Sequence, residues 1–196
     1  MEERLTGIDR QETLRYLQCR GGEVPAGLEG LLARCEEQLV AAARPRCVWR
    51  LFDREADGTL AGTGFRPAGR DIASLLEGCP QAILMAATLG AEAESLQRRA
   101  QGRDMAEAVI LDAAGSAAIE GVCDALCEEL AARFRPRRLT MRFSPGYGDM
   151  PLEQQRAIFR VLEIEKRIGV SLAESGLMIP QKSVTALIGV RGDREG

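Results

Sequence analysis

The chain has 196 residues, of which 45% are apolar and 28% are charged, and it contains no histidine. This balance is typical of one globular domain, and a net charge of −3 argues against nucleic acid as a partner. Without histidine, a Ser-His-Asp triad, a Cys-His dyad, histidine-ligated zinc and a histidine general base are all excluded. A histidine-ligated haem or corrin is excluded too, unless a partner supplies the imidazole.

The N-terminus is charged and lacks the apolar stretch of a signal peptide, and the longest uncharged run, Gly78 to Ala91, is too short to span a bilayer. We therefore expect a cytoplasmic protein without membrane contact. The cysteine spacing fits neither an iron–sulfur triplet nor a four-cysteine zinc site, so no metal ligands are predicted. In a reducing compartment we expect free thiols, mostly in the core, at Cys19, Cys35, Cys47, Cys79, Cys123 and Cys127.

Apolar spacing predicts helices and strands that alternate irregularly along the chain. In chain order, the predicted elements are helix 10–20, helix 25–43, strand 47–52, strand 59–65, helix 71–76, strand 81–89, helix 91–100, helix 104–134, strand 138–143, helix 151–168, strand 170–173 and strand 183–190.

Turn and cap residues add detail to these elements. Residues 59–65 are expected to be the hairpin partner of strand 47–52, across the turn 56–58. Asp71 has the position of an N-cap for the short helix that follows it. Small residues fill the middle of helix 104–134, and they would let another element approach closely.

Helices of unequal length between scattered strands favour an α+β fold over a doubly wound one. We expect a single domain with a mixed or antiparallel twisted sheet and long flanking helices. Residues 1–100 are expected to form an N-terminal helical and β part of this domain. Residues 101–196 are expected to form a core that carries the most informative loop of the sequence.

That loop is RFSPGYGDMP, from Arg142 to Pro151. Arg142 can hold a carboxylate with two hydrogen bonds, and Tyr147 offers a ring face and a hydroxyl. Gly146 lets a ligand approach the main chain. This composition suits a small zwitterionic ligand with a purine, although a structural connection between strand and helix has a similar composition. Glu120, on the small-residue helix, is either a solvated charge or an ion-pair partner of Arg142.

The loop and the residues after it resemble the activation (reactivation) domain of vitamin B12-dependent methionine synthase. That family has an Arg-x-x-x-Gly-Tyr loop, a helix, and a Leu-x-Glu-Ser…Met-x-Pro…Ser-Val run into a strand. The resemblance covers about residues 105–190, and the whole chain resembles a free-standing form of the domain. The corresponding residues are Arg142, Gly146, Tyr147, Leu172, Glu174, Ser175, Met178, Pro180, Ser183 and Val184.

The resemblance implies an accessory protein that binds S-adenosylmethionine and docks over cobalamin carried by a partner. It would support reductive remethylation of cobalamin that has been oxidised to an inactive form. The implied partner is a corrinoid protein or a methionine synthase that lacks its activation domain, with a flavodoxin-like electron donor. The chain would thus be a component of a methyltransferase system in methionine biosynthesis, and not a complete enzyme alone.

The resemblance also implies roles for individual residues. Arg142 would pair with the methionyl carboxylate, and Glu120 would accept hydrogen bonds from the ligand. The backbone of Ser144 and Gly146 would meet the adenosine end, and Tyr147 would flank the ligand near the corrin. No catalytic residue is implied.

A second interpretation remains open. The family's N-terminal segment contributes an aspartate to the ligand site, and no residue of this chain can be matched to it. The chain would then be a ligand-free module that keeps the fold and the surface for a corrinoid protein but does not bind S-adenosylmethionine.

Overall fold

The computed structural model describes residues 4–19, 24 and 27–192. The α-helices are α1 (Arg10–Tyr16), α2 (Glu29–Ala42), α3 (Arg70–Leu75), α4 (Ala91–Gln101), α5 (Met105–Arg133), α6 (Gln155–Leu162) and α7 (Ile164–Ile168), and Leu152–Gln154 forms the 3-10 helix η2. The strands are β1 (Arg46–Asp53), β2 (Gln81–Thr88), β3 (Ser171–Leu172), β4 (Met178–Ile179) and β5 (Ser183–Val190).

The main sheet is antiparallel and has the order β1-β2-β5. In β2, Gln81 pairs with Asp53 of β1 and with Val190 of β5, and the pairing continues without interruption to Thr88. The central strand is apolar along nearly its whole length because both of its faces are covered. The predicted strands 81–89 and 183–190 and the antiparallel α+β sheet are thereby confirmed.

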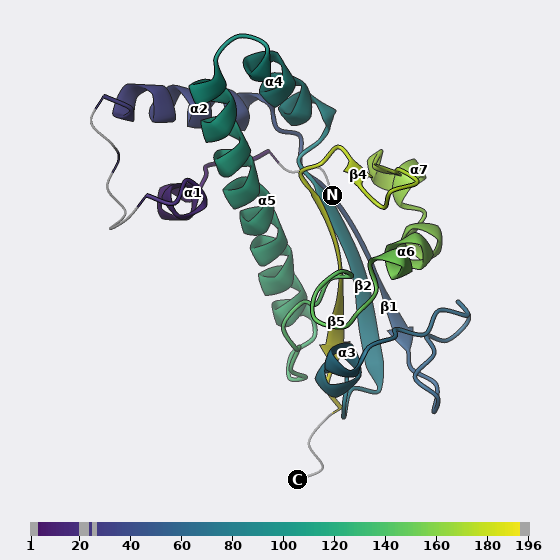
Figure 1. The fold of residues 1–196 in the computed structure, drawn as a ribbon. Helices are drawn as coiled ribbons and strands as arrows, with labels where there is room; N and C mark the ends of the chain where they lie inside the picture. Colours follow the sequence, from purple (N-terminus) through teal and green to yellow (C-terminus); the bar gives the residue numbers. More distant parts are fainter. Residues whose placement is uncertain (1–3, 20–23, 25–26, 193–196) are drawn as a thin grey trace.

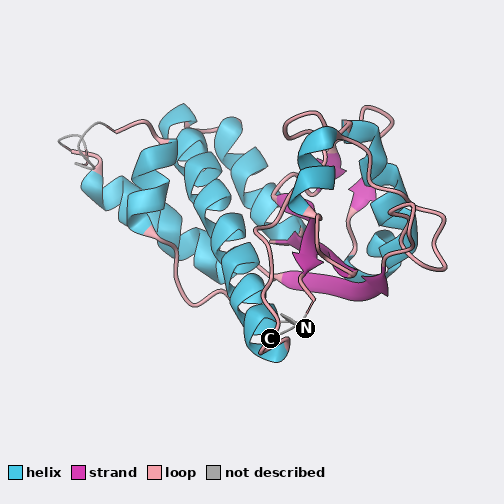
Figure 2. Cartoon of the chain, turned by 90° about the horizontal axis from the view of Figure 1, so that it is seen from below, coloured by secondary structure: helices cyan, strands magenta, loops and turns pink. Residues whose placement is uncertain are grey.

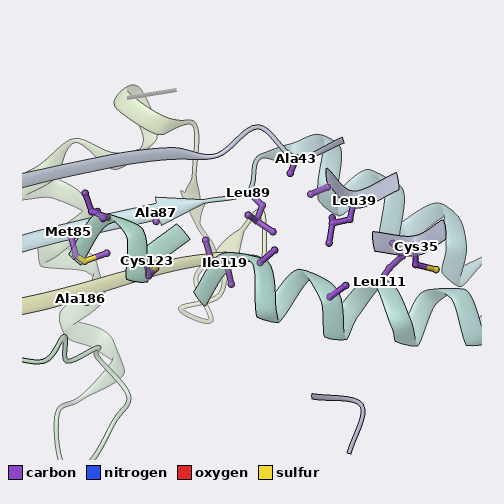
Figure 3. Packing of buried hydrophobic residues seen from close by; sticks show 14 of the residues in the cluster. Cys35, Leu39, Ala43, Met85, Ala87, Leu89, Leu111, Ile119, Cys123 and Ala186 are labelled. Carbon is purple, nitrogen blue, oxygen red and sulfur yellow. The ribbon is translucent and has the colours of Figure 1, made fainter. Parts of the chain in front are cut away.

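Each face of the sheet is covered by its own layer of helices, as Figures 1 and 2 show. On one face, Ile83, Met85 and Ala87 of β2 pack in a core with residues of α1, α2 and α5, part of which Figure 3 shows. On the other face, Leu84 and Ala86 pack in a second core with residues of α3, α6 and α7. Since β2 comes from the first half of the chain and β5 from the second, both halves build one domain.

Helix α5 is the longest element and carries acidic residues beside the open edge of β5. It begins at the N-cap Asp104, whose carboxylate accepts hydrogen bonds from the amides of Ala106 and Glu107. The small residues of α5 were expected to let another element approach closely, and the Lys182 side chain does so. A Cβ built at Gly115 would lie 3.0 Å from the Lys182 Cε.

The first two helices are shorter than the sequence pattern predicts. Helix α1 ends at Tyr16, and α2 begins at Glu29. The predicted end signals Gly21 and Gly22, and the predicted first-turn Pro25, lie outside the described residues.

The predicted hairpin is confirmed only at its turn, where Arg54 bridges Leu60 and the Ala61 amide donates to the Asp53 carbonyl at 2.9 Å, whereas residues 59–65 do not form a strand. The partner of β1 is β2, and residues 54–65 fold back on themselves with isolated bridges at Leu60. Gly62 and Gly64 have φ angles of +72° and +65°, and across this tight turn the Leu60 amide donates to the Phe65 carbonyl at 2.8 Å. Leu60 is fully buried in the second core, so its side chain stabilises this turn.

The predicted strand 138–143 lies beside β5, but it is not a regular strand. Its bridges are Leu139 to Val190 and Phe143 to Leu187, so one extra residue is accommodated between them as a bulge. In this interval the Gly189 amide donates to the side-chain oxygen of Thr140 at 2.8 Å, where a regular ladder has a carbonyl. The side-chain bond interrupts the ladder.

The predicted helix 151–168 is also divided. It consists of η2, α6 and α7, and the break lies at Glu163, whose φ is +52°. Leu162 and Ile164 are both buried, although two positions two residues apart in one α-helix face opposite sides. The left-handed residue between them lets both side chains face the same core.

None of the six cysteines forms a disulfide, as expected, and Cys35, Cys79 and Cys123 are buried. Burial raises the pKa of the Cys35 thiol to about 11. Within the described ranges, none of the helices has the length and apolar character needed to cross a bilayer.

We predict that Gly189→Ala destabilises the fold by about 1–3 kcal/mol, because its new methyl group overpacks the second core. A Cβ at this position would lie 2.7 Å from the Cys79 Sγ and 3.0 Å from the Leu76 Cδ2. Urea unfolding measures the change. The control is Gly121→Ala on α5, where no described atom outside its chain neighbours and the helix's own backbone lies within 4 Å of the built Cβ. This control should gain about 0.5–1 kcal/mol from helix propensity, and equal effects of the two substitutions would contradict the prediction.

Candidate functional site

A cavity of about 1000 Å³ lies at the outer edge of β5. Segment 138–143 runs beside β5 only as far as Phe143, which exchanges two backbone hydrogen bonds with Leu187. Pro145 has no amide hydrogen and cannot continue such a ladder, so the loop leaves the edge there. The cavity is lined by Glu120, Cys127, Thr140, Met141, Arg142, Phe143, Ser144, Pro145, Tyr147, Leu152, Gln155, Gly176, Leu177, Met178, Gln181, Lys182, Ser183, Val184 and Thr185.

Arg142 lies between two carboxylates of α5. It donates through Nη2 to Glu120 Oε2 and through Nη1 to Asp124 Oδ1. Glu120 and Asp124 are four residues apart, so they share one face of the helix. Burial works against the charged guanidinium, but the hydrogen bonds with Asp124 and Glu120 outweigh it and raise the pKa of Arg142. Of the two states considered for Glu120, the structure has the ion pair.

Sequence reasoning missed Asp124. The signal that could have identified it is its spacing of four residues from Glu120, which places any polar residue on the same helix face. It also missed Cys127, whose Sγ lies 4.0 Å from the Arg142 Nη1 in the cavity wall. Burial raises the pKa of the Cys127 thiol, which keeps it protonated at neutral pH.

The loop after Arg142 is held by its own backbone and by α3. The Gly146 amide donates to the Met150 carbonyl at 2.9 Å, and the Tyr147 amide donates to the Ser144 carbonyl at 3.2 Å. Asp149 accepts from the amides of Arg70 at 2.8 Å and of Asp71 at 3.1 Å. The expectation that Asp71 caps α3 is therefore wrong, because Asp71 lies in the first turn and Asp149 satisfies the free amides.

Four of the five predicted site residues line the cavity. They are Glu120, Arg142, Ser144 and Tyr147. Gly146 does not line it, and a Cβ built there would lie 3.4 Å from the Leu152 Cδ1. The Gly146 amide hydrogen is used within the loop, so its contribution is to the turn, at a φ of +89°.

Lys182 is the other charged side chain in the cavity wall. Its Nζ donates to Asp112 Oδ1 and to Ser116 Oγ, each at 2.8 Å, and its side chain is only 15% exposed. Burial opposes ionisation of Asp112, but the hydrogen bonds from Lys182 and Gln97 outweigh it and lower the pKa of Asp112. Lys182 is thus neutralised by α5 and is not an open surface cation.

Exposed apolar side chains surround the mouth of the cavity. Met141 is 72% exposed, Tyr147 is 70% exposed and Leu177 is 60% exposed. Together with Leu152 they form what we call the apolar rim. Large exposed apolar residues that gather around a pocket are typical of a binding surface. No group of three or more acidic or cysteine side chains that could hold a metal ion occurs in the described part of the chain.

Fold and cavity together define an α+β module with an arginine-containing pocket at a sheet edge. Residues 128–193 match the family model described as "Vitamin B12 dependent methionine synthase, activation domain". A solved structure, the MetH reactivation domain bound to AdoHcy, is similar with a TM-score of 0.68 at 19% sequence identity. That similarity covers 100% of this chain and 79% of the other chain. No curated protein matches the chain by sequence.

These findings confirm the resemblance to the methionine synthase activation domain. The fold is that of the reactivation domain, and the similarity extends through residues 1–100, for which the sequence alone shows no match.

We predict that Asp149→Ala lowers stability at neutral pH. The backbone hydrogen bonds from Arg70 and Asp71 lower the pKa of Asp149. Because its folded pKa lies below the unfolded value of about 3.9, the stabilisation is full above that pH. It is lost as the pH falls through the folded pKa. Urea unfolding at pH 7 and pH 3 should therefore show a smaller pH dependence for the variant than for the wild type. An unchanged difference between the two pH values would contradict this.

We also predict that substitutions in the loop affect stability at its buried position Met150 but not at its exposed position Tyr147. Met150→Ala should cost about 2–5 kcal/mol, because Met150 is buried in the second core. Tyr147→Ala should change stability by less than about 0.5 kcal/mol, because its side chain lies on the surface. Thermal and urea unfolding of the two variants compare them directly. A similar loss for both would mean that Tyr147 is part of the core.

Proposed function

We propose that this protein binds S-adenosylmethionine in the cavity beside β5 and presents it to cobalamin on a partner protein. The single observation that carries the proposal is the meeting of Arg142, from the Arg-x-x-x-Gly-Tyr loop, with Glu120 of α5 in the cavity wall. Each residue belongs to a separate segment, and both have counterparts in the implied family site. The match of residues 128–193 to the activation domain model supports the proposal.

The cavity residues suit the parts of the ligand. Arg142 can hold the methionyl carboxylate, and Glu120 can accept hydrogen bonds from the ligand's polar hydrogens. The exposed ring of Tyr147 can face the positively charged sulfonium. Ser144 lies in the cavity wall, where its backbone can meet the adenosine end. A volume of about 1000 Å³ is at the upper end of the range for small-molecule sites, which leaves room for the ligand and for access from the rim.

The rim gives the chain a surface for a partner. Its exposed apolar side chains surround the ligand and would lie against the face of the corrin. When bound to the partner, cobalamin would supply the acceptor for the sulfonium methyl group, and a flavodoxin-like donor would supply the electron. This chain's own residues only bind, orient and shield the ligand. The partner would be a corrinoid protein or a methionine synthase without this domain. A cytoplasmic location is in keeping with six cysteines that form no disulfide.

A second candidate is a ligand-free module that binds the corrinoid protein through the rim alone. One observation favours it: Arg142 already has carboxylate partners in Glu120 and Asp124. A ligand carboxylate therefore competes with them or uses the remaining N–H groups of the guanidinium.

We predict that calorimetry detects S-adenosylmethionine binding to the wild-type chain. Arg142→Ala should weaken binding by about 1.5–3 kcal/mol, because a charge-assisted hydrogen bond to the ligand is lost. Arg135→Ala is the matched control, since Arg135 is an exposed arginine outside the cavity wall. Thermal unfolding of both variants checks that they are folded.

Two results would count against the first candidate. The first result is that a folded wild-type chain gives no heat of binding at millimolar S-adenosylmethionine. The ligand-free module would then be the remaining candidate, and a pull-down with a corrinoid protein tests it. An affinity of Arg142→Ala equal to that of the wild type would show that the arginine is structural.

A further inference from the structure

We infer that Asp124 makes the cavity selective for ligands with a positive charge at the sulfur position, so that S-adenosylmethionine binds better than its thioether product. This inference rests on the proposed function and assigns a role to a residue outside the implied family site. Asp124 does not line the cavity itself, but it bonds directly to the arginine that does.

The charge balance around Arg142 is the first argument. One guanidinium lies between two carboxylates, so the cluster of Glu120, Asp124 and Arg142 has a net charge of −1. The other charged side chain of the cavity wall, Lys182, is neutralised by Asp112. The cavity therefore carries a negative charge, even though its most prominent residue is an arginine.

The hydrogen-bond pattern is the second argument. Arg142 uses Nη2 on Glu120 and Nη1 on Asp124, so both ends of the guanidinium are occupied. A ligand carboxylate that binds Arg142 either uses the remaining N–H groups beside these two carboxylates or displaces one of them. Asp124 is the easier one to displace, because its side chain is 62% exposed, compared with 39% for Glu120. Even when the Asp124 carboxylate is displaced from Arg142, it remains on α5 beside the guanidinium.

The shape of the ligand is the third argument. The methionyl part of S-adenosylmethionine is short, so an arginine-bound carboxylate leaves both the ammonium and the sulfonium near the two carboxylates. S-adenosylmethionine has a net charge of +1, whereas its thioether product S-adenosylhomocysteine has none. At separations below the Debye length of roughly 8 Å, this extra charge is not fully screened. A site with a net charge of −1 favours the cationic ligand.

A purely structural role for Asp124 makes a different prediction. If Asp124 only holds Arg142 in place, its removal alters the binding of every carboxylate ligand by the same factor. If it sets charge selectivity, its removal changes the ratio of affinities between cationic and neutral ligands. The ratio therefore separates the two roles, whereas a single affinity does not.

The test is calorimetry with S-adenosylmethionine, S-adenosylhomocysteine and sinefungin, on the wild type and on Asp124→Asn. Sinefungin has an amine in place of the sulfonium, so it keeps the charge without the transferable methyl group. We expect the wild type to bind both cationic ligands better than S-adenosylhomocysteine. In Asp124→Asn this preference should fall by about threefold to tenfold, as expected for one partly exposed charge.

Glu128→Gln is the matched control. Glu128 is exposed on α5, one turn beyond Asp124, and Arg142 bonds to Asp124 and Glu120 instead. The control removes the same charge from the same helix and should leave the affinity ratio unchanged. Thermal unfolding confirms that both variants are folded.

The inference is overturned if Asp124→Asn changes all three affinities by the same factor, or if Glu128→Gln reduces the ratio as much. It is also overturned if sinefungin behaves like S-adenosylhomocysteine, because the methyl group would then decide selectivity. Failure of the wild type to bind any of the three ligands would instead contradict the proposed function, and this inference with it.

Discussion

The pairing of β2 with strands on both sides is the constraint on which the rest of the structure depends. Strand β2 is paired with β1 and with β5 along its full length, and its side chains pack in both cores. A strand that is buried on both faces needs a helical layer over each. This requirement places α5 over one face and α6 and α7 over the other, and it leaves β5 as an edge beside α5 (Figure 1).

The candidate site is a consequence of how that edge ends. A bulged segment covers β5 up to Phe143, and the proline that follows cannot extend the ladder. Arg142 is thereby held at the mouth of a cavity, opposite the acidic face of α5. Asp149 fixes the far end of the same loop by capping α3. The loop is anchored at both ends, while Tyr147 between them stays exposed. Such a loop can present side chains without contributing them to a core.

Much of the fold could be predicted from local patterns. The apolar run of β2 and the long helix 104–134 were both correctly identified. The errors occurred where a distant partner competed with the local signal. Leu60 bridges both Arg54 and Phe65, so residues 59–65 form a second turn and not a strand. A left-handed Glu163 lets Leu162 and Ile164 face the same core. For the site, the Arg-x-x-x-Gly-Tyr loop and Glu120 were visible in the sequence. The spacing of four residues places Asp124 on the same helix face as Glu120, but its importance comes only from the arginine that it contacts.

The sequence by itself determined which chemistries are available: no imidazole, no metal-binding cysteine spacing, and one loop with an arginine, two glycines and a tyrosine. It also determined the fold class, because the periodicity of apolar residues depends only on neighbours along the chain. Only the tertiary structure decided that Arg142 is bonded to Glu120 and Asp124, 22 and 18 residues earlier in the chain. The physical reason is that ion pairing depends on the distances between charged groups in space. The position of Arg142 at the sheet edge and of the two carboxylates on α5 sets those distances.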